Sequence, residues 1–287
     1  MTNRAAELTA FFATNPDFIV CTLASVRGSS PRAQGTFMLV GQAGLFGTIG
    51  GGALEYMVIE HARRLIGSGR AEDAMDVPLG PEIGQCCGGR VAVKLRHADA
   101  ARRLELAAEV AAEDAALPHV YVFGAGHVGR ALAQILALLP VQLAVIDTRR
   151  DELDLLPPAI DARVVAMPEA VVRKAPAGSS FVILTHDHAL DFLIAQEALA
   201  RVDSPYVGMV GSATKRARFS SWYRDEGGDA AALERLVLPI GQMGLGDKRP
   251  AVIAALAAAE IMVHIGQREA DVARIGTPET SVVALGQ

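Results

Sequence analysis

Cysteine and lysine are scarce in this sequence of 287 residues, and an excess of positive charge is absent. Its three cysteines, Cys21, Cys86 and Cys87, are odd in number and two are adjacent, unlike those of a disulfide-stapled secreted domain. We therefore expect a reducing, cytoplasmic location. The 27 basic and 32 acidic residues give a net charge of −5, which argues against nucleic acid as a partner. Because 23 of the basic residues are arginines, a single arginine is weak evidence for a site.

Long apolar runs are also missing. The longest uncharged run, residues 33–54, contains seven glycines and is too polar and too flexible to span a membrane. Residues 1–12 carry Arg4 and Glu7 without the apolar core of a signal peptide, so we expect a short amphipathic helix and no membrane association. The hydrophobic share of 51% and the charged share of 21% are close to globular averages, and the length predicts about two domains.

Two patterns of secondary structure meet near residue 118. Residues 1–98 combine short strands with a helix, which predicts a mixed α+β domain, and residues 99–117 form a helix that we expect to be a linker. Residues 118–270 alternate strands and helices, which predicts a Rossmann-like, doubly wound parallel sheet and an α/β fold. Residues 271–287 have weak periodicity and are expected to be a disordered tail. The predicted strands are 18–26, 36–40, 90–95, 119–123, 141–146, 163–166, 181–185, 206–210 and 236–238, and the predicted helices are 1–12, 53–66, 99–116, 127–139, 189–202, 215–224 and 250–265.

Three spaced glycines mark the first turn of the second domain, where Gly124, Gly126 and Gly129 form the pattern G-x-G-x-x-G. The first allows a tight turn, the second leaves room for a diphosphate, and the third lets the helix pack on the strand. Asp147 ends the next predicted strand, where a carboxylate can accept hydrogen bonds from ribose hydroxyls. We therefore expect a phosphate-bearing ligand; the alternative is that the glycines only shape the turn. The arginine pair that follows Asp147 either favours a 2′-phosphate or faces water.

Two further turns follow predicted strands of the same sheet. His186, Asp187 and His188 open a helix at the carboxyl end of a strand, where ligands bind in such sheets. They either line the pocket, where they bind a metal, hold an anion or move protons, or else Asp187 caps the helix and the histidines pack or face solvent. Gly211 and Ser212 either contact an anion, or Ser212 is the N-cap of the next helix.

Glycine-rich turns occur in the first domain as well. Three consecutive glycines, residues 50–52, precede a helix that carries Glu55, and we expect them to allow the close approach of a ligand or another chain. The turn from Arg27 to Ser30 offers guanidinium and hydroxyl groups to a phosphate, or is a solvated surface turn. In the segment GQCCGG the adjacent thiols of Cys86 and Cys87 are either accessible soft ligands and nucleophiles or small buried apolar side chains.

Seven segments resemble, in the same order, those of the XdhC/CoxI family: SVRGSSPRAQGTFMLV, GTIGGGALE, GQCCGG, VFGAGHVGRAL, THDHALD, GMVGSATKR, and LPIG followed by KRPAVIAALAAAEI. The resemblance covers residues 8–266 and is closer to the xanthine dehydrogenase branch than to the carbon monoxide dehydrogenase branch. Ala53 departs from it, because relatives often have a larger side chain there.

The resemblance implies a carrier rather than an enzyme. Such a carrier binds molybdenum cofactor (Mo-molybdopterin), shields it while a cysteine desulfurase installs the sulfido ligand, and inserts it into xanthine dehydrogenase. It also implies a carboxyl-terminal Rossmann domain and a homodimer, and it makes Cys86 and Cys87 candidates for contact with molybdenum or for sulfur relay. The residues that we expect to bind the cofactor are Arg27, Ser30, Gly50, Gly51, Gly52, Glu55, Gln85, Cys86, Cys87, Gly124, Gly126, His127, Gly129, Asp147, His186, Asp187, His188, Gly211 and Ser212.

Two other functions remain as alternatives. An NAD(P)-dependent oxidoreductase is supported by the glycine turn and Asp147, although no hydride-transfer pair is recognisable. A metal-dependent hydrolase centred on His186 and His188 explains the fewest features.

Overall fold

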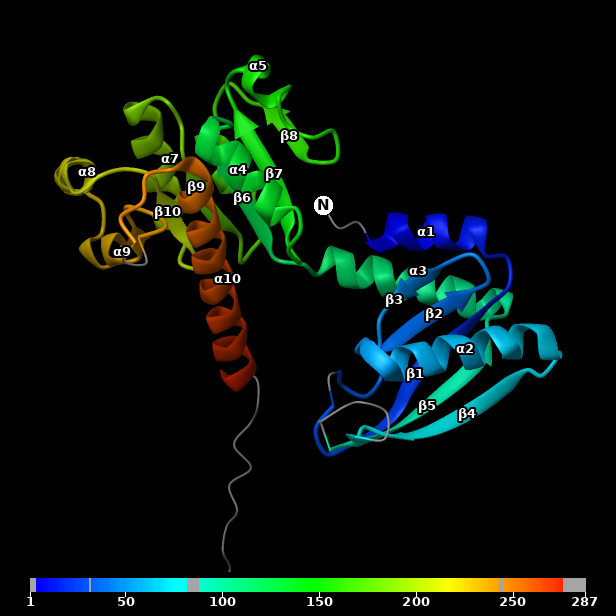
Figure 1. Cartoon of the computed structure of the whole chain (residues 1–287). Helices are drawn as coiled ribbons and strands as arrows, with labels where there is room; N and C mark the ends of the chain where they lie inside the picture. The colour runs from blue at the N-terminus through cyan, green and yellow to red at the C-terminus, as the bar shows by residue number, and fades with distance from the viewer. Residues whose placement is uncertain (1–3, 31, 82–87, 243–244, 276–287) are drawn as a thin grey trace, which may run out of the picture. The chain divides into compact units, whose positions relative to one another are not determined.

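The computed structural model describes residues 4–30, 32–81, 88–242 and 245–275. These residues form two compact units, of which the first ends at Ala116 and the second begins at Leu117, and each is described by itself. The first unit contains an antiparallel sheet with helices, and the second contains a parallel sheet (Figure 1). This combination confirms the predicted α/β fold.

The first unit is built on a five-stranded antiparallel sheet in the order β3-β2-β1-β5-β4. Its strands are β1 (Phe18–Arg27), β2 (Phe37–Gly41), β3 (Leu45–Gly47), β4 (Glu72–Pro78) and β5 (Arg90–His97). Strands β3 and β4 were not predicted from the sequence. β3 is too short to show an alternating pattern, and β4 is an edge strand in which three acidic residues interrupt the apolar ones without a regular alternation.

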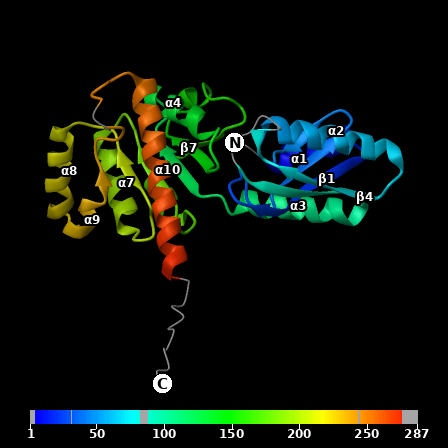
Figure 2. The same ribbon diagram turned by 60° about the horizontal axis from the view of Figure 1, so that its bottom comes forward.

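Helices cover both faces of this sheet, and they are α1 (Arg4–Thr14), α2 (Gly52–Ser68) and α3 (Ala100–Ala115). Successive residues of a strand point to opposite faces. Ile19 and Cys21 of β1 therefore join an apolar cluster with Leu54 of α2, whereas Phe18 joins a second cluster with Leu106 of α3. Figure 2 shows α2 and α3 on opposite sides of the sheet, so each face has its own core.

Helix α3 packs within the first unit, where we expected residues 99–117 to be a linker. Asp99 caps its N-terminus by accepting a hydrogen bond from the N–H of Arg102 at 2.8 Å. Leu106 and Val110, four residues apart on one helix face, are buried among side chains of α1 and the sheet. This narrow apolar stripe has its partner in α1, far away in the sequence, which is why the helix belongs to the first unit.

The second unit has a six-stranded sheet in the order β11-β10-β9-β6-β7-β8, and all its neighbouring strands are parallel. The strands are β6 (His119–Phe123), β7 (Gln142–Asp147), β8 (Asp161–Val164), β9 (Ser180–Ile183), β10 (Val207–Met209) and β11 (Leu236–Val237). After β8 the chain returns to the other side of β6 to form β9. The strand order therefore reverses between β6 and β9, and in doubly wound sheets such a reversal places the ligand crevice at the carboxyl ends of these strands.

Helices lie on both faces of the parallel sheet, as a doubly wound fold requires. They are α4 (His127–Leu136), α5 (Arg150–Leu153), α6 (Glu169–Lys174), α7 (His188–Ala200), α8 (Ala213–Asp225), α9 (Ala230–Glu234) and α10 (Pro250–Ile275). Leu132 of α4 and Ile261 of α10 share one apolar cluster, and Ile194 of α7 and Phe219 of α8 share another. The short helices α5, α6 and α9 were not predicted from the sequence.

Helix α10 is longer than predicted and includes residues 271–275, which we expected in a disordered tail. The remainder of that predicted tail, residues 276–287, lies outside the described residues. In the described part of the chain, α10 is the one helix whose length and composition would suffice to cross a membrane. This is weak evidence for a span, because Ala254, Ala257 and Ile261 are buried in the core of the second unit.

Candidate functional site

The candidate residues of the second unit lie at the carboxyl ends of β6, β7, β9 and β10, at the strand end, in the loops and in the first turns of the helices that follow, all at the carboxyl edge of the parallel sheet. The loop after β6 comes very close to the loop after β9. A Cβ atom on Gly124 would lie 2.3 Å from the carbonyl oxygen of Leu184, and the φ angle of Gly124 is +112°. Both the close approach and the backbone conformation therefore require glycine at position 124.

The other two glycines of the motif differ in their surroundings. A Cβ atom on Gly129 would lie 1.9 Å from the carbonyl oxygen of Gly124, so this glycine is required for packing. Gly126 has a φ of −65°, which any residue adopts, and no described atom lies within 4 Å of its Cβ position. Gly126 is also the N-cap of α4, and among the described residues no side chain caps this helix. The second glycine thus leaves open space at a helix N-terminus, which is where we expected a phosphate to approach.

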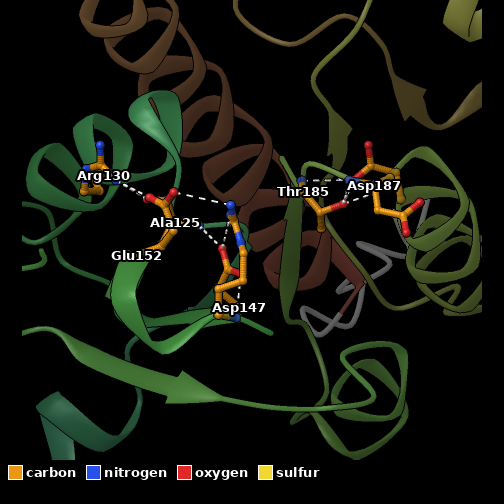
Figure 3. A network of polar contacts seen from close by, with 8 residues as sticks. Ala125, Arg130, Asp147, Glu152, Thr185 and Asp187 are labelled. Carbon is orange, nitrogen blue, oxygen red and sulfur yellow. Dashed lines mark hydrogen bonds and ion pairs between the residues drawn. The ribbon is translucent and has the colours of Figure 1, made fainter. Parts of the chain in front are cut away.

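A closed ring of hydrogen bonds holds the loop between β6 and α4 (Figure 3). The N–H of Ala125 donates to Asp147 Oδ2 at 2.8 Å, and its carbonyl oxygen accepts from Arg130 Nη1 at 2.8 Å. Arg149 donates to both oxygens of Asp147, at 3.1 and 3.0 Å, and to Glu152 Oε1 at 3.3 Å. Arg130 also donates to Glu152 and so closes the ring. The glycine loop is therefore held in shape by the protein's own groups.

Asp147 is buried at the end of β7, the position predicted from the sequence. Burial alone would raise the pKa of its carboxyl group, but hydrogen bonds from the side chain of Arg149 and from the N–H groups of Ala125 and Arg149 lower that pKa below its usual value. Asp147 stands where a carboxylate can accept hydrogen bonds from ribose hydroxyls. In the structure its oxygens accept from Arg149 and Ala125, because the turn after β7 brings the guanidinium group back onto the carboxylate.

Asp187 is the N-cap of α7, which is the role that we gave as the alternative to ligand binding. Its Oδ1 accepts hydrogen bonds from the N–H groups of Ala189 at 2.8 Å and Leu190 at 3.4 Å. His186 and His188 are exposed on either side of it. Among the described residues, no group of three or more histidine, cysteine, aspartate or glutamate side chains is arranged to hold a metal ion. The imidazoles are thus accessible to a ligand at the carboxyl edge.

Ser212 is likewise a helix N-cap, since its hydroxyl accepts a hydrogen bond from the N–H of Lys215 at 3.3 Å. Next to it, a Cβ atom on Gly211 would lie 2.7 Å from Lys215 Cδ. The glycine therefore lets the loop after β10 pass directly over the lysine side chain. Ser212 and Gly211 are both exposed at the same edge as His186.

An ion pair that was not predicted from the sequence joins two of these loops. Asp191, in the first turn of α7, is fully buried and accepts hydrogen bonds from the N–H and the hydroxyl of Thr185 at 3.0 and 2.7 Å. Its second oxygen accepts from Lys215 Nζ, which also donates to the carbonyl oxygen of Val210 at 2.9 Å. Two signals were available in the sequence: Asp191 interrupts an apolar helix, and Lys215 is one of few lysines.

The backbone conformation explains why the first unit has three consecutive glycines. Residues 50–52 have φ angles of +131°, +74° and +65°, a region that side chains other than glycine's rarely allow. Glu55 Oε2 accepts hydrogen bonds from the N–H groups of Ile49 at 3.2 Å and Gly51 at 3.0 Å, and from the hydroxyl of Thr48 at 2.6 Å. The carboxylate of Glu55 thus holds the loop on which we expected a ligand or another chain to approach closely.

The turn from Arg27 to Ser30 lies against the chain that follows the predicted thiol segment. Ser29 and Gly88 form an isolated parallel bridge, and a Cβ atom on Gly89 would lie 2.0 Å from the carbonyl oxygen of Ser29. Gln85, Cys86 and Cys87 themselves lie outside the described residues.

Arg27 and Ser30, the first and last residues of this turn, differ in how accessible they are to a ligand. Arg27 is exposed, whereas Ser30 Oγ is buried and has no hydrogen-bond partner among the described residues. The remaining cysteine, Cys21, lies in the core of the first unit, and burial raises the pKa of its thiol to about 12. Cys21 is therefore a packing residue. The candidate residues form two groups, one in each unit.

Comparison with known proteins adds independent information. The family model described as the XdhC Rossmann domain matches residues 120–261, and the model described as the XdhC and CoxI family matches residues 12–77. The uncharacterized protein YqeB of Escherichia coli strain K12 is 28% identical over 263 residues, which cover 86% of this chain and 43% of that protein. The chain therefore spans less than half the length of this curated relative.

A solved structure has the same fold over nearly the whole chain. It is a Bacillus halodurans protein described as a xanthine dehydrogenase, with a TM-score of 0.77. The two chains are 18% identical, and the match covers 96% of this chain and 98% of the other. At this identity the likeness shows the fold alone.

Proposed function

Because the chain belongs to the XdhC and CoxI family, we propose that it is a carrier of molybdenum cofactor rather than an enzyme. Membership implies a role in the maturation of a xanthine dehydrogenase or a carbon monoxide dehydrogenase. In our proposal the chain acts in the cytoplasm, as a homodimer, with xanthine dehydrogenase as the recipient. It binds Mo-molybdopterin as cargo, shields it while a cysteine desulfurase installs the sulfido ligand, and then inserts it into the recipient.

The open space at Gly126 is the observation that carries this proposal. Molybdopterin ends in a phosphate monoester, which has about 1.5 to 2 negative charges near neutral pH. The uncapped N-terminus of α4 supplies N–H groups and the positive end of a helix dipole beside that space. Because Asp147 and Arg130 already fix the loop at Ala125, little ordering of the loop is required when a phosphate binds.

The other exposed groups at this edge suit the remainder of the cargo. A pterin ring presents several hydrogen-bond donors and acceptors, and His186 and His188 are accessible side chains that can pair with them. Gly211 and Ser212 stand in the loop after β10, and His127 is exposed in the first turn of α4. In this proposal these residues contact the pterin end of the cofactor, and Gly126 faces its phosphate.

The first unit is proposed to serve the sulfur chemistry. Cys86 and Cys87 are the thiols proposed to approach molybdenum or to relay sulfur, with Gln85 beside them. Ser30 supports this assignment, because its buried hydroxyl has no hydrogen-bond partner in the described part of the chain and buried hydroxyls are usually paired. Arg27 adds an exposed positive charge at the same turn.

A carrier must hold its cargo tightly enough to protect it, but less tightly than the recipient does. We therefore propose that release follows docking to xanthine dehydrogenase. The experiment that tests the proposed function is to purify the full chain from cells that make molybdenum cofactor and from cells that do not. Bound pterin is then measured by fluorescence after oxidation, molybdenum by elemental analysis, and nicotinamide by absorbance.

The expected result is pterin with a near-equal amount of molybdenum in the first preparation, and neither in the second. Cofactor at about 100 times its dissociation constant should also stabilise the fold by about 2.7 kcal/mol, which is visible as a higher melting temperature. Protein that carries NAD(H) and never pterin would overturn the proposal and favour an NAD(P)-dependent oxidoreductase.

A further inference from the structure

A dinucleotide binds at two neighbouring places at the carboxyl edge of a Rossmann sheet, which we call the phosphate corner and the ribose corner. The glycine loop after the first strand takes the diphosphate, and the carboxylate at the end of the next strand accepts the ribose hydroxyls. The glycine loop of this chain is open at Gly126, but the second corner is filled by a side chain of the protein itself. Arg149 lies on Asp147 where a ribose would lie.

The hydrogen bonds to Asp147 leave no room for a ribose. Oδ1 accepts from the N–H of Arg149 at 3.0 Å and from its Nε at 3.1 Å, and Oδ2 accepts from Arg149 Nη2 at 3.0 Å and from the N–H of Ala125 at 2.8 Å. A carboxylate has about four acceptor positions, so these four donors use them all. The Asp147 side chain is only 3% exposed. A ribose hydroxyl would have to displace a bidentate, charge-assisted pair.

Three of the five N–H donors of the Arg149 guanidinium group are used within the ring, and its positive charge is balanced there by two carboxylates. Its Nε and Nη2 donate to Asp147, and its Nη1 donates to Glu152 Oε1 at 3.3 Å. Glu152 is in turn held by Arg130. The two carboxylates next to the guanidinium group would also repel a phosphate.

From this geometry we infer that Arg149 determines the specificity of the site by occupying the ribose corner. The site then takes a phosphate monoester without an attached adenosine, and it excludes NAD(H) and NADP(H). This inference rests on the proposed function insofar as the glycine loop is the place where the phosphate binds. It adds that nicotinamide dinucleotides are excluded from the site and that Arg149 is the side chain that excludes them.

The test is NADH binding to the full chain, measured by the enhancement of NADH fluorescence, in the unaltered protein and in Arg149→Ala. We expect no saturable binding to the unaltered protein up to about 1 mM, and at least a tenfold gain in NADH affinity when Arg149 is removed, because Asp147 then regains free acceptor positions. Arg150→Ala is the matched control: it removes the same charge from the next, exposed residue and should leave NADH binding as in the unaltered protein.

Two results would overturn the inference: micromolar binding of NADH by the unaltered protein, or folded Arg149→Ala protein that gains no NADH affinity. The first measurement needs no substitution, so the inference stays testable even if Arg149→Ala does not fold. Bound pterin, measured in the same preparations, separates this inference from the proposed function. Absence of pterin from every preparation would contradict the carrier proposal, whereas the NADH result would still decide the role of Arg149.

Discussion

The ammonium group of Lys215 and the carboxylate of Asp191 form a buried ion pair that ties the loop after β10 to the loop after β9. Lys215 also holds the carbonyl oxygen of Val210, and Asp191 also holds Thr185. The pair therefore fixes the loops that carry the exposed His186 and Ser212.

Lys215→Met should lower the free energy of unfolding by about 3 to 5 kcal/mol, because it leaves Asp191 buried without its counter-charge. Urea denaturation measures the change. Lys174→Met is the control, since Lys174 is exposed on α6 and its loss should change stability by no more than about 0.5 kcal/mol. Combining Lys215→Met with Asp191→Leu should recover part of the loss. A change below about 1 kcal/mol for Lys215→Met alone would contradict a structural role for the pair.

Gly126→Leu should abolish retention of the cofactor while the protein stays folded. The new side chain extends into the space at the N-terminus of α4, where a Cβ atom has no described atom within 4 Å, and losing a glycine N-cap costs about 1 kcal/mol or less. Pterin content and melting temperature are measured together. Gly129→Ala is the contrasting variant: its Cβ atom would lie 1.9 Å from the Gly124 carbonyl oxygen, so we expect a marked loss of stability. Full pterin occupancy in Gly126→Leu would show that the loop is only structural.

Replacing Cys86 and Cys87 together by alanine should impair molybdenum retention or sulfuration more than folding, if these thiols act on the cargo. Cys21→Ala is the matched control, because Cys21 is a buried core residue whose high pKa keeps its thiol neutral. It should reduce stability by about 1 kcal/mol and leave molybdenum content unchanged. A double variant that loses stability but still transfers its cofactor would instead indicate that Cys86 and Cys87 are packing residues.

Asp203 should contribute stability that disappears in acid. Hydrogen bonds from the side chain of Arg201 lower the pKa of the Asp203 carboxyl group, and a hydrogen bond from the N–H of Gly178 lowers it further. Burial acts in the opposite direction, and the resulting pKa is about 2, below the usual value near 3.9. Because the folded pKa is the lower one, the contribution is fully present above about pH 4 and is lost as the pH falls toward 2.

The variant that tests this is Asp203→Asn. Allowing for solvent screening, it should be less stable than the unaltered protein by on the order of 1 kcal/mol at pH 7, with the difference becoming small near pH 2 and vanishing below it. Denaturation curves at several pH values between these limits give the profile. A difference that does not change with pH would show that the charge of Asp203 contributes nothing.

The fold of the second unit was predictable because its signals are local. Strands and helices alternate with clear periods, and the glycine spacing at Gly124 marks the first strand-to-helix turn. In the first unit the same signals did not reveal β4 and indicated a linker at α3. An edge strand that carries three acidic residues lacks a clear period-2 pattern, and it becomes recognisable only when it pairs with β5. The narrow apolar stripe of α3 finds its partner in α1, which is distant in the sequence.

The sequence by itself determined the parallel sheet, the order of its strands along the chain, and the positions of Asp147 and Gly126 at its carboxyl edge, because backbone geometry and residue spacing act over a few residues. Only the tertiary structure decided what those side chains do. Asp147 is bound by Arg149, Asp191 is paired with Lys215, and Glu55 occupies its own glycine loop. The physical reason is that a carboxylate has few acceptor positions, and the folded chain decides which neighbouring donors fill them before any ligand arrives.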